Sequence, residues 1–477
     1  MKSPYRANPV FDLTQIDQVM SRLSSISANV HQFKNALVPI NRLPPEVLAL
    51  VPTFRGSEQD LINATAVCRH WRRTFISTPD LWTEIVSFGQ EDSQVSTPHV
   101  QAYLERSGSV PIDVQTFAHA FRLFSPHIDR ISSLELYLGR TPNLHEIAEH
   151  LSKPAPILET VILHGGGWDC PTLVLPSSFV EVLLSSIRTL AFHNAILSPG
   201  PYKLSRLTKF TLETGPLPVF PSTVVLDALE CMPLLRFLEL QLYCPSEQRP
   251  VPGDRMVTLP RLEGITITAN GVGREPLIIP VLPALCLPRA HRVSIWSVMA
   301  CGISDAPILP LSFEERLPAL SATPRVSVTL GDGFKLESFG PGQSELTLSI
   351  NTHTRADFTF TQSTFGGTPF GSVRELHVRF LYHNGDSASF IAVLRAMRGL
   401  EWLEMEQNTE CPLEYWAEVD EQAGICPALI ALTITDARPE VAKECFQNLE
   451  QARKRAGVPI AHVEIVYRSR NILLTPS

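Results

Sequence analysis

The sequence has no long hydrophobic run and no C-x-x-C pair. Its longest apolar stretch, Pro276 to Pro288, contains four prolines and is too short to span a bilayer. Residues 1–30 lack the apolar segment of a secretory signal, so we expect no signal peptide. The nine cysteines are an odd number and predict reduced thiols. We therefore expect a cytoplasmic or nuclear protein without a membrane partner.

An excess of basic residues is also missing. The chain has 40 Lys and Arg against 48 Asp and Glu, a net charge of −8, whereas a nucleic-acid-binding protein is expected to have a basic surface. With 44% hydrophobic residues among 477, the chain can bury a sizeable core. These numbers predict a folded protein with no nucleic-acid partner.

Motifs for catalysis are incomplete. His164-Gly165-Gly166-Gly167 resembles the oxyanion-hole string of lipases, but no G-x-S-x-G nucleophile motif occurs. His145 and His150 are five residues apart, about 140° around a helix, so they cannot bind one metal as an i, i+4 pair does. Gly331-Asp332-Gly333 lacks the third glycine of a dinucleotide loop. We therefore expect that the protein is not an enzyme and binds neither a cofactor nor a metal ion. A hydrolase is a distant alternative.

Residues 12–38 are predicted to form one helix that ends before Pro39. Apolar residues recur there at alternating steps of three and four, which is a heptad seam. The favoured interpretation is a helix that packs on the segment after it or on the body of the protein, and self-association is the less favoured alternative. The seam consists of Ile16, Val19, Leu23, Ile26, Val30, Phe33 and Leu37.

Three short motifs follow in a fixed order: Leu43 to Leu48 (LPPEVL), Val67 to Trp71 (VCRHW), and Leu81-Trp82. Pro44 and Pro45 suit a first helical turn. A second helix is predicted from Ser57, with one apolar face made by Leu61, Ala64, Cys68, Trp71 and Phe75.

The order of these motifs resembles an F-box. The resemblance implies a small helical domain that binds a Skp-type adaptor and, through it, the cullin of an SCF-type ubiquitin ligase. The alternative is a helical hairpin that packs only on the following domain. The residues that match the family's core and adaptor surface are Leu43, Pro44, Leu48, Val67, Cys68, Trp71, Leu81 and Trp82.

Beyond Asp92 the pattern apolar-x-x-apolar-x-apolar recurs. Its intervals average ~27 residues, which is within the range of leucine-rich repeats. Leu262 to Asn270 and Leu400 to Asn408 match the fuller consensus. The strand anchors are Leu134, Val161, Leu190, Phe210, Leu238, Ile265, Val293, Val326, Leu346, Leu376, Leu403, Leu432 and Val463.

Helices are predicted between several of these strands: Leu144–Leu151, Phe179–Ile187, Val224–Cys231, Ala388–Met397 and Pro439–Arg455. Residues 299–345 are the least regular part, and we expect an insertion or loop there. The last helix, with Lys443, Arg453, Lys454 and Arg455, is expected to cap the repeats with a polar outer face.

The predicted fold is α/β: an N-terminal helix (1–39), a helical F-box (40–88), and a leucine-rich-repeat-like solenoid with a curved parallel sheet (89–477). An α/β domain of another topology is the alternative. The layout resembles the large fungal F-box families.

The resemblance implies the substrate-recognition subunit of an SCF-type ligase, whose repeats bind an unidentified protein target. A non-catalytic scaffold outside any ligase is the alternative function. Side chains alternate along a strand, so residues between the anchors point to solvent and are the candidates for target binding. They are Tyr137, His164, His193, Glu239, Trp296, His377, Arg379, Glu404 and Glu406.

Overall fold

The computed structural model divides the chain into two units. The first comprises Met1–Gln115 and Arg130–Ser132, and the second comprises Thr116–Asp129 and Ser133–Ser477. The structure describes residues 13–51, 58–87, 97–139, 142–166, 172–176, 187–198, 204–215, 222–245, 255–272, 281–299, 316, 318, 325–330, 333–339, 345–352, 372–380, 391, 394–395, 397–407, 416, 424–436, 439–467 and 470–474.

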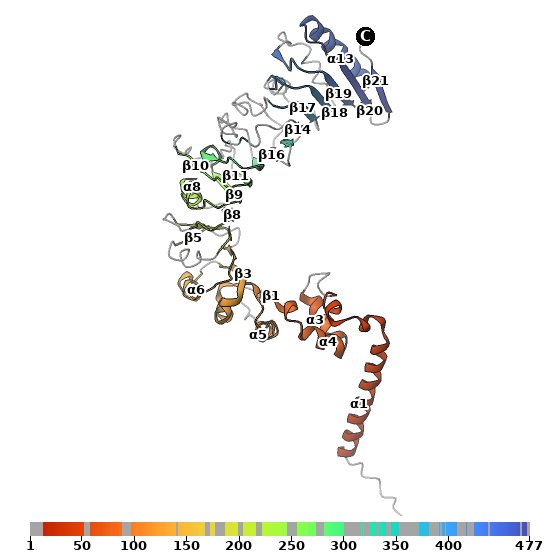
Figure 1. Cartoon of the computed structure of the whole chain (residues 1–477), viewed down its shortest axis with the longest axis vertical. Helices are drawn as coiled ribbons and strands as arrows, with labels where there is room; N and C mark the ends of the chain where they lie inside the picture. Colours follow the sequence, from red (N-terminus) through yellow and green to blue (C-terminus); the bar gives the residue numbers. More distant parts are fainter. Residues whose placement is uncertain are drawn as a thin grey trace, which may run out of the picture. The chain divides into compact units, whose positions relative to one another are not determined.

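The first unit is mainly helical (Figure 1), and the boundary with the second unit falls within the strands Ile112–Phe117 and Ile131–Tyr137, each of which is given below with the unit that holds most of it. Its long first helix matches the predicted bounds to within one residue at each end. The elements are α1 (Leu13–Leu37), η1 (Pro39–Arg42), α2 (Pro45–Ala49), α3 (Glu58–Val67), α4 (Arg69–Ile76), η3 (Pro79–Trp82), β1 (Glu84–Ser87), α5 (Thr97–Arg106) and β2 (Ile112–Phe117).

One expectation for this unit is wrong. The predicted continuous helix through Cys68 is two helices, because Cys68 has extended backbone angles (φ −160°, ψ 172°) and forms the N-cap of α4. Its carbonyl accepts the N–H of Arg72, which starts the new helix. Helical periodicity continues across the break, so the apolar spacing alone could not reveal it.

The second unit contains a largely parallel sheet. Its first block consists of η4 (Ala118–Leu123), η5 (Ser125–Arg130), β3 (Ile131–Tyr137), α6 (Leu144–Leu151), β4 (Thr160–His164), β6 (Thr189–His193), β8 (Lys209–Glu213), α8 (Ser222–Glu230), β9 (Phe237–Pro245), β11 (Gly264–Val272), η6 (Leu282–Ala284) and β13 (Arg292–Met299). The second block consists of β14 (Arg325–Leu330), β15 (Gly333–Phe339), β16 (Glu345–Thr352), β17 (Glu375–Phe380), β18 (Trp402–Gln407), β19 (Ala431–Asp436), α13 (Pro439–Arg455), β20 (His462–Tyr467) and β21 (Arg470–Leu474).

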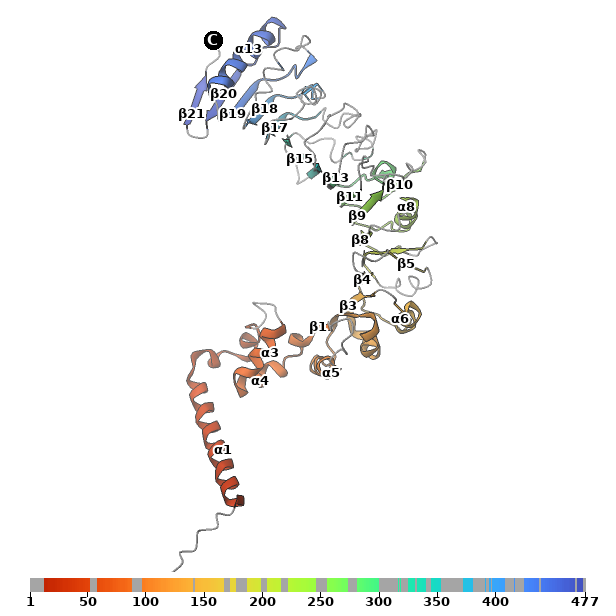
Figure 2. The same cartoon turned by 180° about the vertical axis from the view of Figure 1, so that it is seen from behind.

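Two further pairs of short parallel strands lie outside the main sheet. They are β5 (Leu173–Leu175) with β7 (Ala195–Leu197), and β10 (Val257–Thr258) with β12 (Leu285–Cys286). Helices α6 and α8 lie on one side of the main strands (Figures 1 and 2). At the start of α6, the side-chain oxygen of the N-cap residue Asn143 accepts the backbone N–H of Glu146, and its amide group donates to the Glu146 carboxylate. This local arrangement accounts for the agreement of α6 with its predicted bounds.

The predicted anchors occupy one register row across the sheet. Leu134 lies opposite Val161, Val161 opposite Leu190, and the pairing continues in the same way to Val293. Where the side chains are described the anchors are at most 4% exposed, so they form the core of this unit. The prediction of an α/β body with a parallel sheet is confirmed.

Strand order departs from the chain order in one place. β13 pairs in parallel with β16 rather than β14, and β14 pairs in parallel with β17. Between them β15 is antiparallel to both β14 and β16. The stretch 299–345 was expected to be an insertion or loop, but its described part contributes two strands to the sheet.

The end of the sheet also differs from expectation. β21 adds an antiparallel edge strand beside β20, and the apolar pattern had not identified it. Helix α13 has the predicted bounds. Arg453, however, was expected on its polar outer face and is fully buried, because its guanidinium donates to the carbonyls of Ile425, Cys426 and Val458.

Two predicted helices cannot be compared with the structure. Nearly all of Phe179–Ile187 lies outside the described residues, and Ala388–Met397 is described only in fragments. Val224–Cys231 overlaps α8.

Candidate functional site

The helices of the first unit are held together by three large side chains from the predicted adaptor set. Leu48 and Trp82 are fully buried, and Trp71 is 8% exposed. Trp71 packs edge-on against Phe75 with centroids 5.5 Å apart, and the indole N–H of Trp82 donates to the carbonyl of Phe75 at 2.8 Å. These side chains build the core of the unit rather than its surface.

Other members of the same set face solvent. Pro44 is exposed and Val67 is 58% exposed, whereas Leu43, Cys68 and Leu81 are half-buried. The predicted adaptor residues thus separate into a core group and a surface group.

Two exposed apolar residues were not identified from the sequence. Val47 is 44% exposed and Leu50 is 53% exposed. They are one helical turn apart and the N–H of Leu50 donates to the carbonyl of Val47, so they lie on the same side of α2. The signal for them in the sequence is the run of apolar residues from Val47 to Leu50 in and after a five-residue helix, of which Leu48 and Ala49 are the buried members.

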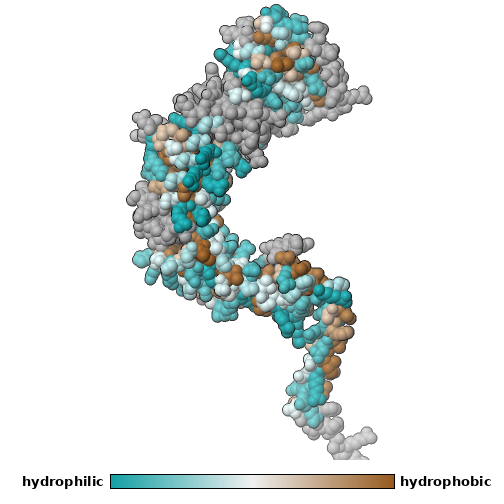
Figure 3. Space-filling view, viewed as in Figure 1, coloured by the Kyte–Doolittle hydropathy of each residue, from teal (hydrophilic) through white to brown (hydrophobic). Residues whose placement is uncertain are grey.

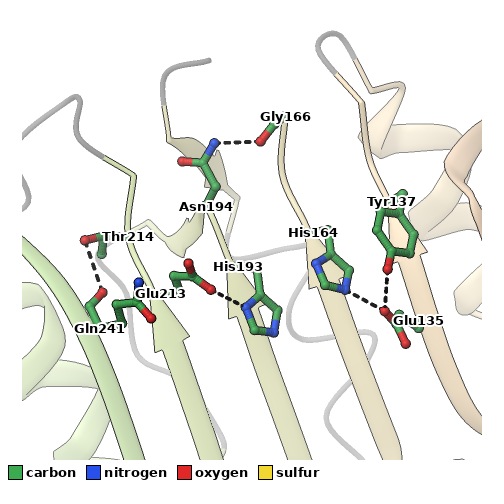
Figure 4. Close-up of polar contacts among 9 residues, drawn as sticks. All are labelled: Glu135, Tyr137, His164, Gly166, His193, Asn194, Glu213, Thr214 and Gln241. Carbon is green, nitrogen blue, oxygen red and sulfur yellow. Dashed lines mark hydrogen bonds and ion pairs between the residues drawn. The ribbon is translucent and has the colours of Figure 1, made fainter. Parts of the chain in front are cut away.

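In the second unit, three predicted target-binding residues form a stack of rings on neighbouring strands (Figure 4). Tyr137, His164 and His193 are register partners on β3, β4 and β6. The Tyr137 and His164 rings are 4.2 Å apart with planes 7° apart, and the His164 and His193 rings are 4.6 Å apart with planes 10° apart. We call these three residues the ring ladder.

Two carboxylates bind the ring ladder, Glu135 at Tyr137 and His164 and Glu213 at His193 (Figure 4). Glu135 accepts the hydroxyl of Tyr137 and pairs with Nε2 of His164, both at 2.7 Å. Glu213 pairs with Nδ1 of His193 at 2.6 Å. The sequence pattern identified the rings but neither carboxylate, although Glu135 is two residues from Tyr137 and therefore on the same face of the strand.

The environment of the ring ladder keeps two of its members uncharged at neutral pH. Burial and the hydrogen bond to Glu135 raise the pKa of Tyr137 to about 12. Burial lowers the pKa of His164, and this outweighs the opposite effect of Glu135. A neutral His164 that donates Nε2–H to Glu135 has its lone pair on Nδ1, so this edge of the ring is a hydrogen-bond acceptor.

Tight turns follow the ladder strands. Asn194 has a positive φ of 50°, and its side-chain amide donates to the carbonyl of Gly166 at 2.7 Å. A Cβ on Gly165 would collide with the backbone carbonyl of Asn194, so this position requires glycine. Within the described residues, His164-Gly165-Gly166 is therefore a close-packed turn, and Gly167 lies outside them.

The remaining predicted target residues do not join the ring ladder. His377 pairs through Nδ1 with Glu404 at 2.7 Å across β17 and β18, and Glu406 lies on β18. Glu239 is exposed on β9, and Trp296 is 41% exposed on β13. The side chain of Arg379 lies outside the described part of the chain. Strands β16, β15 and β14 separate Trp296 from His377, so the predicted residues form separate groups.

Among the described residues, no three or more His, Cys, Asp or Glu side chains are grouped to hold a metal ion. No helix in the described part of the chain is both long and apolar enough to cross a membrane.

The comparison with protein families concerns the first unit. Residues 40–87 match the F-box-like family model. This segment extends from η1 to the end of β1, so the buried tryptophans and the exposed apolar residues described above belong to an F-box-like domain. It is followed by an α/β body with a parallel sheet. No curated protein matches the chain.

Proposed function

We propose that this protein is the substrate-recognition subunit of an SCF-type ubiquitin ligase. The observation that carries the proposal is the F-box-like domain at residues 40–87, since such domains typically bind Skp-type adaptors. In this proposal the exposed residues Val47, Leu50 and Val67 contact the adaptor. The buried Leu48, Trp71 and Trp82 keep that surface in shape.

The second unit is proposed to be a leucine-rich-repeat-like solenoid that binds the target. Support comes from the anchor row, in which each parallel strand repeats the same buried position. On the opposite face, each strand then contributes one solvent-facing residue at each register position, as in the ring ladder. A repeated, solvent-facing row is suited to protein recognition.

The contribution of the protein to ubiquitin transfer is proposed to be proximity without catalysis. Binding adaptor and target to one chain raises the effective concentration of the target near the transferring enzyme. The target surface is proposed to offer hydrogen-bond donors to the ring ladder, because His164 presents an acceptor edge between two carboxylates.

The adaptor step is tested by co-purification of full-length protein with Skp-type adaptor and cullin. We expect Val67→Asp to reduce adaptor recovery at least ~10-fold, since it places a charge in an apolar contact. Val174→Asp is the matched control, because Val174 is 45% exposed but lies on β5, outside the F-box-like domain. Equal recovery of adaptor with both variants would reject the proposed surface. Absence of adaptor and cullin from the wild-type preparation would favour a scaffold outside any ligase.

The target step is tested by comparing bound proteins with and without proteasome inhibition. Trp296→Ala combined with Arg379→Ala is expected to lower target recovery several-fold while adaptor recovery stays unchanged, because Trp296 is 41% exposed and tryptophan and arginine are the residue types typical of hot spots. Ile430→Ala is the control, since Ile430 is 48% exposed and immediately precedes β19. Unchanged recovery of every bound protein would move the target site away from these strands.

A further inference from the structure

Within the described residues of the first unit, helix α1 carries an apolar face that is left uncovered. None of its residues is buried. A stripe of hydrophobic residues runs along the helix in Figure 3. Its seven seam residues, Ile16, Val19, Leu23, Ile26, Val30, Phe33 and Leu37, are 42% to 71% exposed. An apolar surface of this kind marks an interaction site. The expectation that this helix packs on the segment after it is not met among the described residues of the first unit, and packing on the body stays a prediction.

The spacing of the seam specifies the shape of what covers it. Steps of three and four alternate without a break from Ile16 to Leu37, which is a repeat of 3.5 residues per turn. On a straight helix of 3.6 residues per turn such a seam drifts by ~20° per heptad. A second helix with the same seam follows this drift by supercoiling, and its side chains fit between those of the first.

The charges of α1 are compatible with a second copy of itself. If Ile16 is heptad position a, Arg22 is at a g position and Lys34 is at an e position. Both positions flank the seam. In a parallel pair Arg22 faces Ser27 and Lys34 faces Asn29 of the other copy, and in an antiparallel pair they face Asn29 and Met20. No like charges meet in either arrangement.

A lipid surface fits this helix less well. Helices that lie on membranes have a polar face rich in Lys and Arg. The polar face of α1 is mostly uncharged, with Ser21, Ser24 and Ser25 on it. The helix has only two Lys or Arg residues, and the negative charge of Asp17 offsets one of them.

The size of the seam is sufficient for a pair. Burial of an apolar side chain removes ~60 to 120 Å² from water, so the fourteen seam side chains of two copies would bury on the order of 1,000 Å². This is near the lower limit for a specific interface. The 25 residues of α1 give a continuous contact about 37 Å long.

We propose that α1 is a self-association helix, and that two copies of this protein pair through its seam as a two-stranded coiled coil. The pairing uses residues other than those proposed for adaptor and target binding, because α1 lies outside the F-box-like domain and outside the sheet.

The test is the mass of the purified full-length protein in solution, by sedimentation equilibrium and light scattering over a concentration series. We expect twice the 52.9 kDa of one chain. Leu23→Glu with Val30→Glu places charges in the seam and is expected to raise the dissociation constant at least ~100-fold. Ser21→Glu with Ser25→Glu is the matched control, because it adds the same charge to the polar face and should remain dimeric.

Folding is checked separately, since α1 buries no residue and its variants should leave the thermal transition of the rest of the chain unchanged. A wild-type protein that is monomeric at every concentration would overturn the proposal. So would a seam variant that stays dimeric, a polar-face control that dissociates, or a mass of three or four chains. A monomer that binds vesicles of neutral phospholipid would assign the face to lipid instead.

Discussion

The ring of Tyr137 lies flat against the ring of His164, with centroids 4.2 Å apart and both side chains bonded to Glu135. The two residues are 27 positions apart in sequence and directly opposite each other on β3 and β4. Their contact is a consequence of the anchor row, since each is the third residue after a buried anchor. A single carboxylate thereby fixes the orientation of two rings on neighbouring strands.

The stability of the protein should depend on pH through His164. Burial lowers the pKa of His164 in the folded state below its ordinary value of about 6.5. As the pH falls through about 6.5 the unfolded chain takes up this proton before the folded chain does, so His164 destabilises the fold on the acid side. Between about pH 7.5 and pH 5.5, we expect the melting temperature of His164→Gln to fall less than the melting temperature of the wild type.

Scanning calorimetry at the two pH values measures this difference. His462→Gln is the control, because His462 is exposed. The same pH slope for wild type and His164→Gln would refute the proposed contribution.

Adaptor binding should be lost by two different routes in the F-box-like domain. Trp82→Ala removes a fully buried indole and is expected to cost about 3–5 kcal/mol of folding free energy in the first unit. Val67→Asp changes an exposed side chain and should leave the free energy of unfolding within about 0.5 kcal/mol of the wild-type value. Chemical denaturation with adaptor titration separates the two routes, and equal destabilisation by both variants would contradict the division into core and surface.

The buried guanidinium of Arg453 should stabilise the end of the sheet. It donates to the carbonyls of Ile425 at 2.8 Å and Cys426 at 3.0 Å, and the two carbonyls belong to a turn in which Cys426 has a positive φ of 43°. Arg453→Met would leave these carbonyls without their donor, at a cost of about 2–4 kcal/mol. Arg455→Met, on the exposed side of the same helix, should cost under about 0.5 kcal/mol. Urea denaturation compares the pair, and similar midpoints for both would show that the Arg453 contacts do not stabilise the fold.

Gly165 should tolerate no side chain. A Cβ there would collide with the backbone carbonyl of Asn194, so Gly165→Ala is expected to destabilise the second unit by about 1–3 kcal/mol. Gly424→Ala is the matched control, since a Cβ on Gly424 would meet no atom within 4 Å. The measurement is the shift in melting temperature of each variant, and a Gly165→Ala protein as stable as the control would disprove the close approach.

The sequence predicted those parts of the fold that depend on local periodicity. Anchors such as Leu134 and Leu376 recur with a spacing that identifies strands, and helices α6 and α13 have the bounds that the sequence predicted. The break at Cys68 and the partners of β14 and β16 could not be predicted. The apolar spacing continues across Cys68 although the helix breaks there, and the repeated strand pattern is the same whichever strand lies alongside.

Of the candidate site, only the solvent-facing positions on each strand could be predicted from the sequence. Alternation along strands identified Tyr137, His164 and His193 as solvent-facing. Their stacking and their pairing with Glu135 and Glu213 depend on side-chain conformations that no sequence pattern specifies. Arg453 shows the opposite case, because its charge predicted exposure while three carbonyl groups compensate its burial.

The reversed order of β14, β15 and β16 affects how the sheet assembles. Val293 pairs with Leu346 and Val326 pairs with Leu376, each about 50 residues away, whereas Leu376 pairs with Leu403 after 27. Doubling the length of a closed loop adds only about 0.6 kcal/mol of chain entropy. An additional hairpin at this point is therefore thermodynamically inexpensive, although its distant pairings form slowly. The hairpin between β13 and β17 leaves the in-order pairing of β11 with β13 and of β17 with β18 unchanged.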